Sequence, residues 1–364
     1  MGKVLVSTFL ISLKRLESWF QRQKRVLPWR DQPSIYRVWI SEIMLQQTQV
    51  VAVVPYFEKF IARFPSVEVL AKASEEEVMK YWAGLGYYSR ARNLRLAAQE
   101  IVRSGRFPDT REAWLELPGI GPYTAGAILS IATHQPIPIL DGNVERVLSR
   151  LRCVSRKNGD VAFKSRLWRI SEIFVTAADR HQIDPSITNQ ALMELGATLC
   201  SPRKPACLLC PLQELCRAAQ TGTQDHYPPK KKPKKWIQVK ERLHCLLDDS
   251  GRVLLRRRQK GEWRAGLWDL MDDEPKSLGI RSVSIGEVET QHIVTRHKIH
   301  RTTAVWQVKG PAAQMNLLKA AEYLGPGLRG GTDEKWVDMR NPEVPVGSAL
   351  KRTLKRVLET VVAP

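Results

Sequence analysis

Apolar side chains recur at helical spacing along the first part of the chain. Near the N-terminus they fall at intervals of four, three and four residues, which places them on one face of an amphipathic helix. The residues of this face are Phe9, Leu13, Leu16 and Phe20. Ser74-x-x-Glu77 and Asp109-x-x-Glu112 have the form of capping boxes, and Asp184-Pro185 places proline at a helix start. We therefore expect residues 1–225 to be helical almost throughout, without strands.

The pattern changes after residue 225. Residues 226–235 combine prolines with lysines, which is typical of a semi-rigid basic linker. Beyond it, short runs of β-forming residues predict strands, and Asp249-Ser-Gly251 predicts a hairpin turn. The expected strands are Trp236–Val239, Arg242–Leu247, Val253–Arg257, Thr302–Val308 and Lys335–Met339, and the expected helices are Met315–Leu324 and Ser348–Val361. This pattern predicts an α+β domain at 236–364.

Residues 117–143 interrupt the helical part with a distinctive motif. Pro118, Gly119 and Gly121 cannot continue a helix comfortably, although apolar residues at helical spacing lie on both sides. A glycine hairpin that leads into a helix presents backbone N–H groups, which favour an anion such as phosphate. Asp141 follows where an apolar run meets a turn. Taken separately, the hairpin could be an ordinary helix connection and Asp141 an N-cap. Together they suggest a site that holds a nucleic-acid backbone and directs one carboxylate toward it.

Composition narrows the class of partner. The chain has 364 residues, 57 Lys and Arg against 37 Asp and Glu, a net charge of +20 and 43% hydrophobic residues. This length favours two domains, and the charge favours nucleic acid first and an anionic membrane second. The apolar run from Val4 to Leu13 is too short to span a bilayer. We expect a cytoplasmic, DNA-associated monomer with no membrane partner and with reduced thiols.

Four of the six cysteines follow the spacing C-x6-C-x2-C-x5-C. Thiolates this close in sequence can converge on one inorganic centre, either zinc or an iron–sulfur cluster. The ligands would be Cys200, Cys207, Cys210 and Cys216, whereas Cys153 and Cys245 are expected in the core.

The hairpin, the following Asp and the cysteine spacing together resemble the helix-hairpin-helix DNA glycosylases of the endonuclease III type, and most closely the MutY-type adenine DNA glycosylases. The resemblance is firm over 25–217 and looser afterwards. It implies an all-α helix-hairpin-helix catalytic domain at 1–225 with a [4Fe–4S] cluster loop at 200–216, and a Nudix-like domain at 236–364. Gly119 and Gly121 would then hold the DNA backbone.

Two positions distinguish the subfamilies. Lyases of this superfamily carry a lysine where this chain has Tyr123, because an amine must form a Schiff base with the sugar. Its absence predicts hydrolysis without strand cleavage. Ser41-Glu-Ile-Met-Leu-Gln-Gln-Thr48 resembles the adenine glycosylase motif, in which Glu42 would protonate adenine at N7. That role requires a raised pKa through desolvation. From spacing alone, a glutamate such as Glu42 on an amphipathic helix is more often a solvated charge, and the resemblance is what favours the catalytic role.

The same resemblance assigns further roles. Asp141 would stabilise the sugar cation that develops as the glycosidic bond breaks, assisted by Asn143 and Tyr123. Gln47 and Tyr87 match residues that fill the gap left by a flipped base, although Tyr87 could be a core aromatic. The adenine pocket would be lined by Arg30 and Gln190.

The second domain resembles a Nudix domain from Val253 to Trp268 but lacks the Glu-rich helix of a Nudix hydrolase, so we expect no hydrolase activity. In the family it reads 8-oxoguanine through a Phe-Ser-His loop. The counterpart here is Val294-Thr-Arg-His297, so Thr295, Arg296 and His297 are the candidate contacts, which could instead bind phosphate.

These observations predict a monofunctional glycosylase acting on double-stranded DNA. It would release adenine mispaired with 8-oxoguanine, or with guanine. The alternatives are a glycosylase for another mismatch, such as thymine opposite guanine, and a DNA-binding iron–sulfur protein without catalysis.

Overall fold

The computed structural model of the 364-residue chain describes residues 2–156, 159–229, 235–259, 261–294, 296–309, 333–340 and 344–362. Residues 230–234 of the expected linker, Thr295 and the expected helix Met315–Leu324 lie outside these residues. The chain divides into two compact units, one made of Met1–Lys72 with Asn93–Lys232 and the other of Ala73–Arg92 with Pro233–Pro364. The segment Ala73–Arg92 thus groups with the second unit, whereas the sequence analysis counted it with the first.

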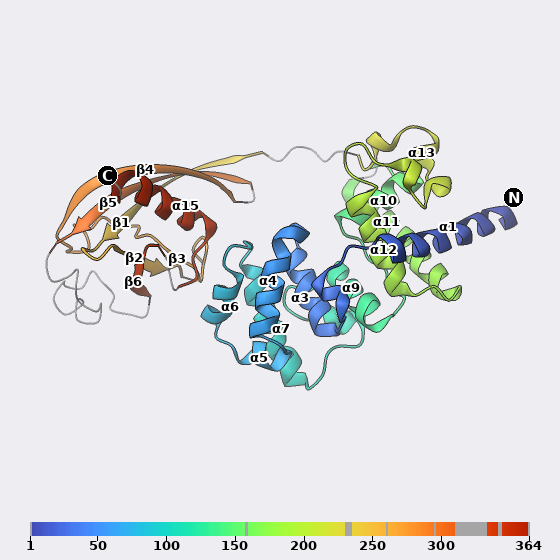
Figure 1. The fold of residues 1–364 in the computed structure, drawn as a ribbon, viewed down its shortest axis with the longest axis horizontal. Helices are drawn as coiled ribbons and strands as arrows, with labels where there is room; N and C mark the ends of the chain where they lie inside the picture. Colours follow the sequence, from blue (N-terminus) through green and yellow to red (C-terminus); the bar gives the residue numbers. More distant parts are fainter. Residues whose placement is uncertain are drawn as a thin grey trace. The chain divides into compact units, whose positions relative to one another are not determined.

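The described residues before 230 form helices and turns, without a strand (Figure 1). The α-helices of this part are α1 Gly2–Gln23, α2 Pro28–Asp31, α3 Ile35–Leu45, α4 Val50–Arg63, α5 Val67–Lys72, α6 Glu75–Trp82, α7 Ser89–Ser104, α8 Arg111–Leu115, α9 Pro122–Thr133, α10 Gly142–Arg152, α11 Gly159–Arg180, α12 Pro185–Thr198 and α13 Arg217–Gln220. Short 3-10 turns occur at Cys207–Leu209, Gln213–Leu215 and Gln224–His226.

The predicted apolar face of α1 is buried. Leu13, Leu16 and Phe20 are each no more than 2% exposed, and the ring of Phe9 packs edge-on against Phe174 with centroids 5.0 Å apart. Burial of large apolar side chains is the main favourable contribution that such a helix makes to folding. The amphipathic spacing therefore correctly predicts which side of α1 docks.

The buried helices α9 and α12 fix the path of the chain toward Asp141. Gly126 of α9 lies so close to the extended segment after it that a Cβ would sit 2.4 Å from the carbonyl oxygen of Pro138. Ser171 donates a hydrogen bond to the carbonyl of Ile139, and Asn189 donates to that of Ile137. These contacts fix residues 137–139, and therefore also the position at which α10 begins.

Two of the three expected helix starts are confirmed. Ser74 accepts a hydrogen bond from the N–H of Glu77, and Asp184 accepts one from Ser186 with Pro185 in the first turn of α12. The third is wrong by one residue, because Thr110 rather than Asp109 caps α8. Serine, threonine and aspartate can all cap, so the sequence alone does not distinguish neighbouring candidates.

The second unit contains a six-stranded mixed sheet with the order β3-β2-β1-β5-β4, in which β6 also pairs with β2 (Figure 1). Strands β1 and β5 are parallel, and the other pairs are antiparallel. The strands are β1 Ile237–Leu247, β2 Arg252–Arg257, β3 Trp268–Asp269, β4 Ser282–Val294, β5 His297–Val308 and β6 Glu334–Asp338, followed by α15 Ser348–Val357 and a π-helical turn at Leu358–Val362.

Both faces of this sheet are covered. On one face, Leu243, Val305 and other strand residues form a core with Leu350 and Leu354 of α15. On the other face, Leu246, Leu254 and Val308 pack with Met271 and with residues of the turns around 278–280. This arrangement confirms the α+β class expected for the second domain.

The sequence-based prediction differs from the sheet in several places: it missed the two-residue strand β3, and its strand Thr302–Val308 is only the later part of β5, which begins at His297. It divided β1 into two strands, although one continuous strand pairs with β5 from Ile237 to Leu247. It also missed β4 as a strand, because most of its residues are exposed or half-buried and its apolar alternation is weak. Residues 272–279 form bends and turns ahead of β4. The hairpin turn at Asp249-Ser-Gly251 is confirmed.

Among the described residues, no helix combines the length and the apolar character needed to cross a bilayer.

We predict that Leu16→Ala lowers the free energy of unfolding by about 2–5 kcal/mol, because it leaves a cavity under α1. The control Ile11→Ala alters the same helix at a side chain that is 48% exposed and should change stability by less than about 0.5 kcal/mol. Urea unfolding followed by helical circular dichroism measures both. Equal effects of the two substitutions would contradict the docked position of α1.

Candidate active site

A pocket of about 830 Å³ in the first unit collects most of the predicted site residues. Its wall is formed by α2, α3, the turn that follows α3, the hairpin before α9 and the starts of α9, α10 and α12. The predicted site residues in its lining are Arg30, Glu42, Gln47, Gly119, Gly121, Tyr123, Asp141, Asn143 and Gln190. The pocket volume is in the range usual for small-ligand sites, which leaves room for one nucleobase.

Glu42 lies on α3 with only 3% of its surface exposed. The hydroxyl of Tyr123, from the first turn of α9, donates a 2.5 Å hydrogen bond to its Oε2 atom. Burial raises the pKa of Glu42 to about 7, the negative charge of Asp141 also raises it, and the Tyr123 bond and the charge of Arg30 act in the opposite direction. Glu42 is therefore a carboxyl group that can hold a proton near neutral pH.

Asp141 is the N-cap of α10. Its Oδ1 accepts a 2.7 Å hydrogen bond from the N–H of Val144, and its Oδ2 accepts a 3.1 Å bond from the Nδ2 atom of Asn143. Burial raises the pKa of Asp141, while these hydrogen bonds oppose the shift by stabilising the carboxylate. The helix N-terminus also favours a negative charge at this point. A capping role and a position in the pocket are thus combined in one residue.

Asn143 is held in place from the far side. Arg146, one turn further along α10, donates a 2.8 Å hydrogen bond to the Oδ1 atom of Asn143 and a 2.7 Å bond to the carbonyl of Cys200. Gly196 of α12 lies close against Asn143, so that a Cβ there would come within 2.6 Å of the Asn143 Cβ. The sequence analysis did not predict a role for Arg146. Its position four residues after Gly142, one helical turn along, was the available signal that it could lie near Asn143.

A second acid, Glu194, also lines the pocket and was missed. It is fully buried and accepts hydrogen bonds from Arg25 at 2.6 and 3.1 Å and from Arg30 at 2.9 Å. Burial alone would raise the pKa of Glu194, but the two guanidinium groups hold it below its ordinary value. Gln190, one helical turn before it, donates to Ser186. The spacing Gln190-x-x-x-Glu194 was the available signal for a shared face of α12.

The hairpin residues have the backbone geometry expected of them. Gly119 has a φ of +78°, and a Cβ there would come within 2.8 Å of the side chain of Asn93. Gly121 is the N-cap of α9 and provides no side-chain cap for it, with Pro122 in the first turn. A helix N-terminus without a side-chain cap can direct its N–H groups to an anionic ligand. The geometry is consistent with a phosphate contact, and that role stays a prediction.

Gln47 and Tyr87 share an uncommon backbone conformation. Gln47 has a φ of +59° and is exposed at the pocket, and Tyr87 has a φ of +50° with 40% of its surface exposed. The guanidinium of Arg90 lies 5.4 Å from the Tyr87 ring centroid. Tyr87 belongs to the second unit. Its exposure disfavours the alternative of a core aromatic.

The expected lesion-contacting residues lie at the β4–β5 hairpin, where Val294 pairs with His297. Arg296 is exposed, and the ring of His297 packs edge-on against Trp263 with centroids 4.9 Å apart. Thr295 lies outside the described residues. The structure therefore places Arg296 and His297 at one turn of the second unit, and their contact with the lesion stays a prediction.

The four cysteines of the predicted cluster converge around a cavity of about 30 Å³ at the end of α12. Burial raises the pKa of Cys210 to about 12, so thiolates at this site require positive charge nearby. Arg150 of α10 places its Nη1 atom 3.3 Å from the Sγ of Cys200 and is itself 3% exposed. A donor set of four thiols with a buried cation beside it fits an anionic iron–sulfur cluster. Of the other cysteines, Cys245 is buried as expected, whereas Cys153 is a half-buried C-cap of α10.

Comparison with known proteins agrees with this arrangement. Residues 40–172 match the family described as "HhH-GPD superfamily base excision DNA repair protein", and residues 200–216 match the "Iron-sulfur binding domain of endonuclease III". The adenine DNA glycosylase of Buchnera aphidicola subsp. Baizongia pistaciae is 35% identical over 261 residues, which cover 71% of this chain and 72% of that protein. The chain belongs to the adenine DNA glycosylases.

The likeness extends across distant members of the adenine DNA glycosylases. The human adenine DNA glycosylase is 44% identical over 221 residues, which cover 58% of this chain and 40% of that protein. The chain thus spans well under half the length of the mammalian relatives it matches. Among solved structures, a thermostable thymine-DNA glycosylase shares 26% identity with a TM-score of 0.50 and covers 59% of this chain and 98% of that one. Cys200, Cys207, Cys210 and Cys216 are the cluster-binding cysteines of the matched iron–sulfur domain.

The raised pKa of Glu42 predicts how stability depends on pH. The folded protein holds the Glu42 proton more tightly than the unfolded chain, whose pKa is near 4.5. This contribution to stability is complete below about pH 4.5 and is lost as the pH rises through about 7. The free energy of unfolding of Glu42→Gln should therefore exceed that of the wild type increasingly from pH 5 to 8, by on the order of 3 kcal/mol.

Urea unfolding at four pH values across this range measures the effect. Glu58→Gln, at an exposed position of α4, is the matched control and should follow the wild type at every pH. If Glu42→Gln also ran parallel to the wild type, Glu42 would be solvated in the folded protein.

Proposed function

We propose that this protein removes adenine mispaired with 8-oxoguanine or guanine in double-stranded DNA, by hydrolysis of the N-glycosidic bond. The observation that carries the proposal is the pair of buried acids in one pocket, which differ in their hydrogen-bond partners. Glu42 is buried with a pKa near 7, whereas Asp141 accepts two N–H hydrogen bonds at a helix N-terminus. Environments that separate two carboxyl groups in this way assign one as the acid and the other as the carboxylate.

Glu42 acts as the proton donor in this mechanism. Adenine leaves poorly as an anion, so protonation of the ring, at N7 by family resemblance, weakens the bond to the sugar. Tyr123 occupies Oε2 of Glu42 and stays a neutral phenol, because burial and the neighbouring acids raise its pKa well above the ordinary value. We assign Oε1 of Glu42 to the base.

Asp141 stabilises the positive charge that grows on the sugar as the bond breaks. Its carboxylate is oriented by Val144 and Asn143, and Arg146 fixes the Asn143 amide that makes one of these bonds. Because Tyr123 stands where a lyase needs an amine, water rather than a Schiff base resolves the intermediate. The product is an abasic site in an uncut strand.

The remaining pocket groups recognise the extruded base. Arg30 and Gln190 line the same cavity as Glu42, and Glu194 holds the guanidinium of Arg30 in position. Gln47 and Tyr87 would fill the space that the base leaves in the duplex. Gly119 and Gly121 would grip the backbone, and Arg296 and His297 would contact the base opposite adenine. The iron–sulfur cluster would be held by Cys200, Cys207, Cys210 and Cys216 in the loop at 200–216, and the proposed steps do not use it. The protein would act as a monomer.

We expect the full-length protein to release adenine from duplexes with adenine opposite 8-oxoguanine or guanine under single turnover, with strand breaks appearing only after alkali. Asp141→Asn and Glu42→Gln should slow release by at least about a hundredfold. Asp225→Asn, an acid of the cluster loop region outside the pocket, is the control and should retain the wild-type rate. The wild type failing on both adenine duplexes, while releasing thymine opposite guanine, would favour the alternative mismatch glycosylase.

The rate should also depend on pH with a defined sign. Since Glu42 must carry a proton and its pKa is about 7, the single-turnover rate should be highest below neutrality and fall by about tenfold per pH unit above about pH 8. A stopped-quench series from pH 5.5 to 9 measures this profile. A rate that instead rises with pH would assign Glu42 as a base.

A further inference from the structure

One end of the sheet in the second unit carries exposed and half-buried aromatic and basic side chains on both of its faces, which together we call the hairpin patch. It consists of Trp236, Trp263, Arg296, His297 and Lys298. Trp236 and Trp263 are 51% and 42% exposed, which is unusual for the largest apolar side chain. The ammonium of Lys298 lies 5.2 Å from the Trp236 ring centroid, and the ring of His297 packs edge-on against Trp263.

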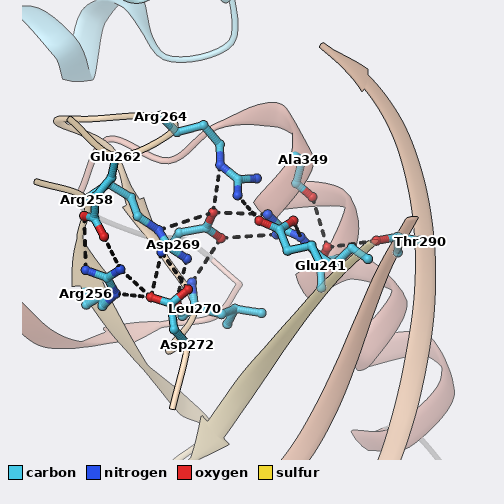
Figure 2. Close-up of polar contacts among 12 residues, drawn as sticks. Glu241, Arg256, Arg258, Glu262, Arg264, Asp269, Leu270, Asp272, Thr290 and Ala349 are labelled. Carbon is cyan, nitrogen blue, oxygen red and sulfur yellow. Dashed lines mark hydrogen bonds and ion pairs between the residues drawn. The ribbon is translucent and has the colours of Figure 1, made fainter. Parts of the chain in front are cut away.

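A partly buried ionic network holds the two chain neighbours of Trp263, Glu262 and Arg264 (Figure 2). Glu262, immediately before Trp263, accepts hydrogen bonds from Arg256. Arg264, immediately after it, pairs with Glu241 and approaches Asp269 to 3.2 Å, with its backbone in the left-handed region at a φ of +63°. Both neighbours of Trp263 therefore point into the network.

The base of the same loop is closed as firmly. The N–H of Arg258 donates to the carbonyl of Leu267, and the N–H of Gly266 donates back to the carbonyl of Arg258, each at 2.8 Å. The Arg258 side chain continues to Asp272, at 2.7 and 2.8 Å (Figure 2). Asp269 in turn accepts two 3.1 Å bonds from the fully buried Arg301.

The network balances its own charge. It contains four arginine and four acidic side chains, namely Arg256, Arg258, Arg264, Arg301, Glu241, Glu262, Asp269 and Asp272. Such a neutral set is not a site for a metal ion or a phosphate, and buried ion pairs add little net stability. What it does is fix the loop, so that Trp263 stands beside His297 in one orientation.

We infer that Trp263 is a nucleobase-contacting residue that stacks on the base opposite adenine, next to the donors of His297 and Arg296. An indole supplies a flat π-face that any base can stack on, whereas side-chain donors distinguish one base edge from another. The cations of the hairpin patch and the net charge of +20 favour DNA over a protein ligand. The inference rests on the proposed function, because it takes the β4–β5 hairpin as the reader of the opposite base.

The test compares Trp263→Ala with the parent protein in full-length chains that also carry Asp141→Asn, so that duplexes are bound without turnover. Fluorescence anisotropy measures Kd for adenine opposite 8-oxoguanine, guanine and a tetrahydrofuran abasic analogue. We expect Trp263→Ala to weaken binding by about tenfold for both duplexes that contain an opposite base, and to change little for the analogue, where no base can stack.

Two further variants keep the result interpretable. Trp263→Phe retains an aromatic face and should recover most of the loss, even if the alanine variant folds poorly. Val283→Ala, at the opposite end of β4 and 47% exposed, is the matched control and should leave all three Kd values unchanged. Combining Trp263→Ala with His297→Ala should be less than additive, since the two rings touch.

If Trp263→Ala weakened binding of the abasic analogue equally, Trp263 would contact the DNA backbone. If it weakened binding of none of the three duplexes, Trp263 would not contact DNA and its exposed ring would fit a protein partner instead. Either outcome overturns the inference. Failure of the proposed function is seen separately, as a wild type with Asp141 intact that releases no adenine.

Discussion

The burial of the Glu42 carboxyl group is the constraint on which the rest of the site depends. Desolvation keeps a proton on this group near neutral pH, and the neighbouring negative charge of Asp141 adds to the effect. The surrounding helices create this environment, because α3 is buried along most of its length and α9 brings Tyr123 against Oε2. The same environment would neutralise a second acid, so Asp141 needs the helix N-terminus and its two hydrogen bonds to act as a carboxylate.

Helix α10 connects the two acids of the pocket to the cysteine loop. It begins at the Asp141 cap, carries Arg146 one turn later and Arg150 a turn after that. Arg146 joins Asn143 to the carbonyl of Cys200, and Arg150 contacts the sulfur of Cys200 and the carbonyl of Ser201. The loop at 200–216 thereby anchors the helix whose N-cap, Asp141, is the sugar-stabilising carboxylate of the proposed mechanism.

Residue type at fixed spacing was sufficient for the cysteine set, whereas the role predicted for Glu42 came from the family resemblance, because spacing alone favoured a solvated charge. The contacts of Arg146 with Cys200 and of Glu194 with Arg25 were not readable from local patterns, because they join segments more than 50 residues apart. Strand β4 was missed for a related reason: it is stabilised by pairing with β5 more than by an alternating apolar face. The N-cap of α8 was predicted one residue too early because Asp109 and Thr110 can both cap a helix.

The left-handed backbones of Gln47 and Tyr87 have a consequence for how the enzyme would meet DNA. A non-glycine residue in this region costs about 1–2 kcal/mol, and the folded protein bears that cost whether or not DNA is present. The turn that directs each side chain outward is therefore already formed in the free protein. The free energy of DNA binding then does not have to order these two turns, and more of it is available to unstack the base.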